Sequence, residues 1–180
     1  MLRTTQPYLI TINKSQLDFS ICLFKLIKTR VKMVKVHIWT KNATHVGHAS
    51  LTVGSTYISF WPAGDADKKD LKVKRSHPGS FMEGLSDDIR NEGNRQPITI
   101  TLDNLDEKAI LLFTREVQNN VPRYQLARNN CSHIIAKCLQ AGASKPSFTP
   151  TAKEYGRMGA VLGYGIWTPE QVLRYARELQ

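Results

Sequence analysis

The sequence predicts an α+β protein in which an antiparallel sheet packs on helices, and three features lead to this prediction. Alternating apolar and polar residues begin at Val34 and continue into two β-rich runs that a two-residue turn, Gly54-Ser55, separates. Two later segments, 104–118 and 130–142, carry the start and stop signals of helices. A further capped helix is indicated at the C-terminal end.

Length and composition fit one soluble globular domain of 180 residues, with 41% hydrophobic and 22% charged residues. The net charge is +10, but half of this excess lies in 1–32, where six basic residues accompany Asp18 alone. We therefore expect 1–32 to be a basic extension and 33–180 to be the functional domain. A presequence, a membrane-surface segment or a true start at Met33 are alternatives for the extension.

The first strand is predicted from Val34, and a hairpin follows it. Glycine in the first position of Gly54-Ser55 suits a type II′ turn between 47–53 and 56–61. This turn fixes the register, so that alternate residues of the two strands share one face. The residues of that face are His48, Ser50, Thr52, Tyr57, Ser59 and Trp61. It is half polar where a core is expected, which makes it a candidate site.

The segment 62–96 reads as a long polar loop with a helical turn near 82–89. An alternating strand at 97–102 follows it. Asn104 is then expected to cap a helix, with Glu107 completing a variant of the capping box.

The helix at 130–142 has both ends marked. Asn130 is a good N-cap, and Gly142 lies where a left-handed residue commonly ends a helix. Cys131 is therefore the first helical residue, and it shares the buried face of the helix. A glycine-rich loop at 143–167 leads to the last helix, which Thr168 caps.

Cys131 is the candidate nucleophile, because the unpaired amides at a helix N-terminus lower the pKa of a thiol. His48 is the candidate general base, although it precedes Cys131 by 83 residues. Ser59 is the third predicted catalytic residue, with Tyr57 as the alternative, because either could orient the imidazole. Cys138, in mid-helix on the apolar stripe, is expected to be a core residue.

An oxyanion site is expected from the backbone amide of Cys131 together with a nearby donor, either Asn129 or Tyr124. The predicted oxyanion and substrate-cleft residues are Asn129, Asn130, Tyr124, Trp61 and Tyr57.

Three motifs together resemble the circularly permuted papain-like fold, which is also described as NlpC-like. They are Gly-His-Ala-Ser-Leu at 47–51, Tyr-Ile-Ser-Phe-Trp-Pro at 57–62 and Asn-Asn-Cys-Ser-His-Ile-Ile-Ala-Lys-Cys-Leu at 129–139. In that fold the histidine strand precedes the cysteine helix. The motifs are similar to those of the PPPDE (desumoylating isopeptidase) family and of the lecithin:retinol acyltransferase-like group. The resemblance covers 34–142 and implies a papain-like catalytic domain that works through a thioester on Cys131.

The two groups imply different reactions. The acyltransferase group has a second histidine on the strand after the base, where this chain has Ser59 and Trp61. The peptidase group works with a Cys–His dyad. The sequence therefore favours cleavage of an amide or isopeptide bond in a protein or peptide substrate. A lipid or other acyltransferase, an esterase and a catalytically inactive binding module are the alternatives.

No cofactor is indicated, and a zinc site is not favoured because His45, His48 and His133 would not converge with Cys131. The odd count of three cysteines argues against a disulfide framework and favours a reducing compartment. The chain lacks a nucleic-acid-binding motif, a membrane-spanning run and a clear signal peptide. These features predict a cytoplasmic protein or an exported effector, and they leave the oligomeric state open.

Overall fold

The computed structural model describes residues 33–64, 75–144 and 149–180, which all belong to one compact unit, Lys32–Gln180. The segment 1–32, expected to be an extension, lies outside the described residues. The strands are β1 (Val34–Trp39), β2 (His48–Val53), β3 (Thr56–Pro62), β4 (Ser76–His77), β5 (Gly79–Phe81), β6 (Ile98–Leu102) and β7 (Tyr124–Gln125). The helices are α3 (Leu85–Asn91), α4 (Glu107–Asn119), α5 (Cys131–Gly142), the 3-10 helix η1 (Ala152–Tyr155), α6 (Gly156–Leu162) and α7 (Pro169–Glu178).

Within the described ranges, five strands form an antiparallel sheet in the order β5-β3-β2-β1-β6, and β4 pairs with β7 in a second, two-stranded sheet. The hairpin register is the predicted one, because Ser50 pairs with Ser59 and Thr52 with Tyr57. Gly54 has a φ of 58°, whereas Ser55 does not have a positive φ, as a type II′ turn requires. The α+β class and the antiparallel sheet are thus confirmed.

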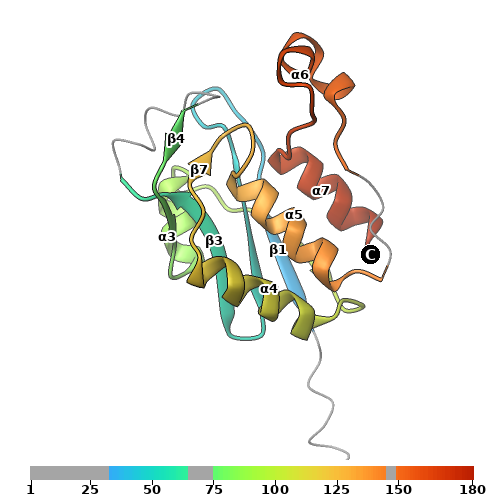
Figure 1. The fold of residues 1–180 in the computed structure, drawn as a ribbon. Coiled ribbons are helices and arrows are strands. Elements are labelled where there is room, and N and C mark those ends of the chain that lie inside the picture. Colours follow the sequence, from blue (N-terminus) through green and yellow to red (C-terminus); the bar gives the residue numbers. More distant parts are fainter. Residues whose placement is uncertain (1–32, 65–74, 145–148) are drawn as a thin grey trace, which may run out of the picture. The chain divides into compact units, whose positions relative to one another are not determined.

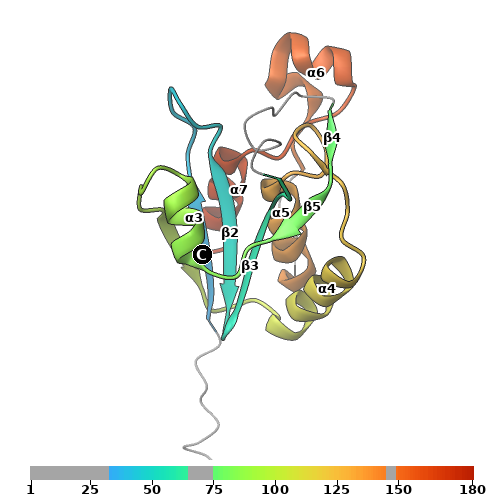
Figure 2. The same cartoon turned by 90° about the vertical axis from the view of Figure 1, so that its left-hand side faces the viewer.

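The five-stranded sheet lies between two layers of helices (Figures 1 and 2). One face is apolar and packs on α4, α5 and α7. The other face carries the polar side chains of the hairpin and is covered in part by α3 (Figure 2). Helix α5 lies centrally in the larger layer, since it contacts α4, α7, β2 and β3. This places the first turn of α5 near the end of the sheet where β2 begins.

The apolar face is buried as its period-two pattern predicts. Val36, Leu51 and Ile58 are fully buried, as are Ile135 and Leu139 of α5. Burial of one such side chain stabilises the fold by about 1.5–3 kcal/mol. The position of α5 is therefore set by its apolar stripe, and the residues at its first turn are held rigidly.

The residues that begin α4 and end α5 differ from those predicted. Asp106 caps α4, because its side chain accepts hydrogen bonds from the amides of Lys108 and Ala109, whereas Asn104 donates to the carbonyl of Leu179. Gly142 is not a left-handed residue after α5 but the last residue within it. A Cβ atom at Gly142 would lie 2.7 Å from Ile110, so glycine is required there by close packing of α5 on α4.

The two predicted loops contain regular structure. The described part of 62–96 includes β4, β5 and α3, and α3 overlaps the helical turn predicted near 82–89 but begins only at Leu85. The segment 143–167 was expected to be a loop but contains η1 and α6, which pack on each other. The last helix begins as predicted, with Thr168 as its cap and Pro169 in its first turn.

Candidate active site

His48 is the first residue of β2 and is enclosed by aromatic rings. Its side chain is 1% exposed, and the ring of Trp61 stacks on it with a centroid separation of 4.2 Å and an interplanar angle of 23°. The ring of Trp39 lies tilted at 5.7 Å. These rings therefore fix the orientation of the imidazole, and the indole of Trp61 covers one of its faces.

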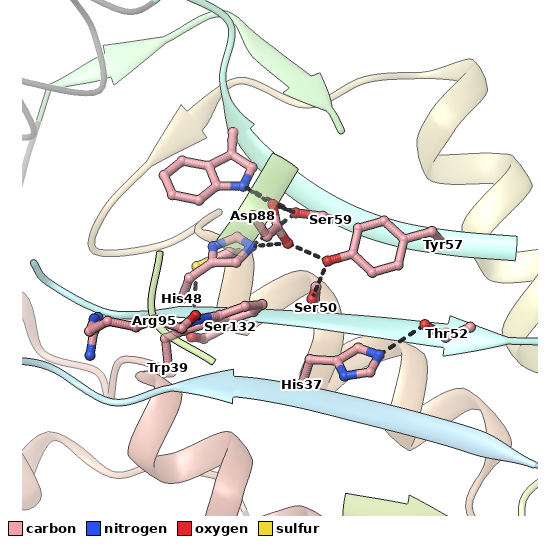
Figure 3. Close-up of polar contacts among 12 residues, drawn as sticks. His37, Trp39, His48, Ser50, Thr52, Tyr57, Ser59, Asp88, Arg95 and Ser132 are labelled. Atoms are coloured by element: carbon pink, nitrogen blue, oxygen red, sulfur yellow. Dashed lines mark hydrogen bonds and ion pairs between the residues drawn. The ribbon is translucent and has the colours of Figure 1, made fainter. Parts of the chain in front are cut away.

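Asp88, on α3, is the centre of the polar network on this face of the sheet (Figure 3). The carboxylate is fully buried and accepts four hydrogen bonds from side chains. His48 Nε2 lies 3.1 Å and Tyr57 Oη 2.5 Å from Oδ2, while Ser59 Oγ lies 2.9 Å and Trp61 Nε1 2.8 Å from Oδ1. Burial by itself would raise the pKa of Asp88, but these donors and the charge of His48 lower it to about 2. The group is therefore a carboxylate in the folded protein.

Cys131 is the first residue of α5, as predicted, and Asn130 is its N-cap. The thiol is 5% exposed and interacts with the side chains of His48 and Ser132 and with the backbone amide of Ala49. Burial alone would raise the pKa of Cys131, but the charge of His48 and these hydrogen bonds outweigh it and lower the pKa. Burial likewise would lower the pKa of His48, and Cys131 and Asp88 together raise it. The two shifts favour a thiolate–imidazolium pair.

The order of these groups matches what a nucleophilic thiol requires. Nε2 of His48 faces Asp88, which leaves Nδ1 for the sulfur of Cys131. An acidic group on the far nitrogen stabilises the imidazolium and holds the ring in one orientation. The arrangement can therefore keep a thiolate ready and can later give a proton to a leaving group.

Cys131 opens into a cavity of about 210 Å³ between α5, the segment before β2 and the segment before α7. The exposed surface of the cavity wall is largely apolar, and the charged residues Lys41 and Glu170 also line it. The apolar lining residues are Val46, Leu126, Ala127, Ile166, Trp167 and Pro169. A substrate group that reaches the sulfur therefore passes along a largely apolar surface.

The residues predicted for the site do not all lie together: some surround Asp88, and others line the cavity of Cys131. Ser59, Tyr57 and Trp61 surround Asp88 and do not line the cavity of Cys131, so Tyr57 and Trp61 are not cleft residues there. Ser59 Oγ also lies 2.9 Å from His48 Nε2.

The two asparagines before the nucleophile also differ from expectation. Asn129 lines a different cavity, together with His133. Asn130 lines the cavity of Cys131, but its amide is already used, since it donates to the carbonyls of Leu126 and Trp167 and accepts from the amide of His133. Tyr124 lines the cavity and contacts Cys131.

Asp88 is the residue that sequence reasoning missed. Ser59 was expected to orient the imidazole, but the group with the charge to do so is this carboxylate. The signal for it was indirect: the polar face of the hairpin offers hydroxyl, indole and imidazole donors, and such a face needs an acceptor from elsewhere. Seven acidic residues lie in 62–96, and no local pattern singles out Asp88 among them.

Comparison with known proteins places part of this chain in a family. Residues 73–180 match the family model described as the IcsB middle domain. The chain belongs to the IcsB middle domain family. The matched region contains Asp88, Tyr124 and Cys131 and begins after the strand of His48. No curated protein and no solved structure is similar enough to this chain to count as a match.

In residues 33–64, 75–144 and 149–180, no cluster of three or more His, Cys, Asp and Glu side chains could hold a metal ion. The helices of this described part are also too short or too polar to cross a membrane.

Proposed function

We propose that this protein is a cysteine-dependent enzyme that attacks a carbonyl group and holds the acyl part of its substrate as a thioester on Cys131. The observation that supports this function is the buried series Cys131–His48–Asp88, in which His48 lowers the pKa of the Cys131 thiol and His48 Nε2 lies 3.1 Å from Asp88 Oδ2. A permuted papain-like core accounts for this series, because its histidine strand precedes its cysteine helix.

The reaction follows from the charges of these groups. The Cys131 thiolate attacks the carbonyl carbon, a C–S bond forms, and the π electron pair moves to oxygen. When this pair returns, the bond to the leaving group breaks, and the His48 imidazolium gives its proton to the leaving nitrogen or oxygen. Asp88 stays ionised throughout and stabilises the imidazolium. Water, deprotonated by His48, then attacks the thioester and releases the acid and the free thiol.

Hydrolysis of an amide or isopeptide bond is the first candidate reaction. The leaving amine needs a proton, and the imidazolium beside the sulfur supplies it. A protein or peptide substrate would enter through the cavity that Cys131 lines.

Transfer of an apolar acyl group to an acceptor other than water is the second candidate, and the apolar cavity wall favours it. The missing second histidine counted against an acyltransferase, but Asp88 occupies the orienting position instead. That argument therefore no longer separates the two reactions.

Mass spectrometry of the intact protein tests the proposal. Wild type, Cys131→Ala and the matched control Cys138→Ala would be treated with p-nitrophenyl acetate, p-nitrophenyl octanoate and a peptide that carries a fluorogenic amide. We expect an acyl adduct, or turnover, in wild type and Cys138→Ala and none in Cys131→Ala. No adduct and no turnover with any probe would refute the enzyme and leave a binding module.

The same probes separate the two reactions. A cavity that takes an apolar chain raises the acylation rate for octanoate over acetate by up to about fourfold for each buried methylene, since each contributes about 0.8 kcal/mol. Turnover of the peptide amide without such a chain preference favours hydrolysis. A thioester that persists in water but is released by an added amine favours transfer.

A further inference from the structure

Tyr124 lies beside the nucleophile, although it precedes it by seven residues in the chain. The intervening segment folds back on itself, because the amide of Gln125 donates to the carbonyl of Asn129 at 3.1 Å and the amide of Arg128 to the carbonyl of Gln125 at 3.0 Å. This turn brings β7 against the first turn of α5. Tyr124 and Cys131 consequently line the same cavity.

The Tyr124 ring is held in place on several sides. Its side chain is 3% exposed, its backbone pairs with His77 across β4 and β7, and its ring contacts that of Phe60 at a centroid distance of 5.4 Å. The hydroxyl interacts with both the thiol and the backbone amide of Cys131. Tyr124 is therefore held beside the nucleophile, on the wall of the cavity that both residues line.

We propose that the Tyr124 hydroxyl and the backbone amide of Cys131 together stabilise the oxyanion that forms when Cys131 attacks a carbonyl group. This inference rests on the proposed thioester chemistry. As the C–S bond forms, the π electron pair of the carbonyl moves to oxygen, and both groups donate hydrogen bonds to that oxygen. Tyr124 keeps its proton throughout, so the proton transfers remain those between Cys131, His48 and the leaving group.

The surroundings keep Tyr124 a donor. Burial, the charge of Cys131 and the charge of Glu92 raise the pKa of Tyr124 well above its usual value. The Tyr124 hydroxyl therefore keeps its proton at neutral pH and can donate it in a hydrogen bond.

The rival donors are less well placed. The amide of Asn130 is fully used in holding α5 to Leu126 and Trp167, and Asn129 lines a different cavity. Ser132 is the remaining rival, since it lines the cavity and its Oγ lies 3.9 Å from the sulfur of Cys131.

Two reactions of the same thiol separate an oxyanion donor from a structural residue. Acylation by p-nitrophenyl acetate passes through an oxyanion, whereas alkylation by iodoacetamide displaces iodide and forms none. Both rates would be measured for wild type, Tyr124→Phe and Ser132→Ala, at a pH where the thiol is fully ionised. Tyr175→Phe is the control, because this tyrosine is buried in the core and does not line the cavity.

In Tyr124→Phe we expect acylation to slow by about 10²–10³-fold, the usual effect of removing one oxyanion donor. Alkylation should stay within about threefold of wild type, because this reaction forms no oxyanion for Tyr124 to stabilise. Tyr175→Phe should leave the ratio of the two rates unchanged.

Three results would overturn this inference and leave the proposed function intact. Equal losses in both reactions would mean that Tyr124 acts on the thiol or on the fold, and unchanged acylation would mean that it is not a donor. A loss of acylation in Ser132→Ala but not in Tyr124→Phe would assign the role to Ser132. A wild-type protein that is alkylated but not acylated would instead overturn the proposed function, and this inference with it.

Discussion

Replacing Asp88 by asparagine changes one atom of the buried network and tests the proposed series directly. Trp61 Nε1 can only donate a hydrogen bond, so the remaining carbonyl oxygen of the substituted side chain must stay on the side of Trp61 and Ser59. The new amide nitrogen then faces His48 Nε2 and donates to it. His48 is thereby held as the neutral form with its proton on Nδ1, and this form cannot accept the proton of the Cys131 thiol.

We expect Asp88→Asn to lower both the turnover rate and the free energy of unfolding. An aspartate-to-asparagine change that fixes the wrong form of a catalytic histidine lowers turnover by about 10⁴-fold. The pKa of Asp88 falls from its ordinary 3.8 to about 2, which corresponds to about 2 kcal/mol of stabilisation of the folded state. Because the folded pKa is the lower one, this contribution is complete above the unfolded value and is lost as pH falls through the folded value.

The assay is the rate of Cys131 alkylation by iodoacetamide at neutral pH, together with urea unfolding of the same variants. Asp87→Asn is the matched control, because Asp87 lies on the same helix and pairs with Arg90 at the surface. We expect the Asp88 variant to react far more slowly than wild type, and the stability difference to shrink as the pH is lowered toward 2. An alkylation rate for Asp88→Asn within about threefold of the Asp87→Asn rate would refute the role given to this carboxylate.

Three further outcomes follow from the same contacts. The alkylation rate of Cys131 should rise with pH around a midpoint below about 8.5, the pKa of an ordinary thiol. His48 lowers the pKa of Cys131, so the thiolate is present above this lowered value. In His48→Ala the midpoint should move above the ordinary value, because burial of the thiol then acts without the opposing charge. A midpoint that His48→Ala leaves unchanged would contradict the ion pair. Cys138 should stay unmodified in the folded protein, since burial raises its pKa to about 12, and peptide mass spectrometry that finds Cys138 labelled as fast as Cys131 would show this wrong. Gly47→Ala should destabilise the protein more than Gly163→Ala in urea unfolding. Both residues have a positive φ, which costs about 1–3 kcal/mol for a residue other than glycine. Only at Gly47 would the new Cβ also lie 2.4 Å from a backbone oxygen, that of Trp39. Equal losses of stability in the two variants would contradict this reasoning.

Local sequence patterns were sufficient for the elements that carry two of the three proposed catalytic groups. A two-residue turn leaves one register for the hairpin, so the face that carries His48, Ser50 and Ser59 could be predicted in advance. The N-cap at Asn130 likewise fixed Cys131 as the first helical residue. Such signals lie within a few residues of the feature they determine, which is why they can be read from one sequence.

Other parts of the site depend on packing between distant segments. The amide of Asn130 is a good cap by sequence, but only the fold shows that it also bonds to Trp167, 37 residues away, and so cannot serve the substrate. Gly142 looks like a helix terminator, and its reason is instead the side chain of Ile110 on the neighbouring helix.

The sequence by itself determined the hairpin and its pairing, the main helices α4, α5 and α7, and a thiol at a helix start with a histidine upstream. The tertiary structure alone decided that Asp88, 40 residues from His48, is the acceptor for that histidine. Its position depends on how α3 packs across the polar face of the sheet. Hydrogen bonds between distant segments leave no local periodicity in the chain, so one sequence does not reveal which carboxylate meets a buried row of donors.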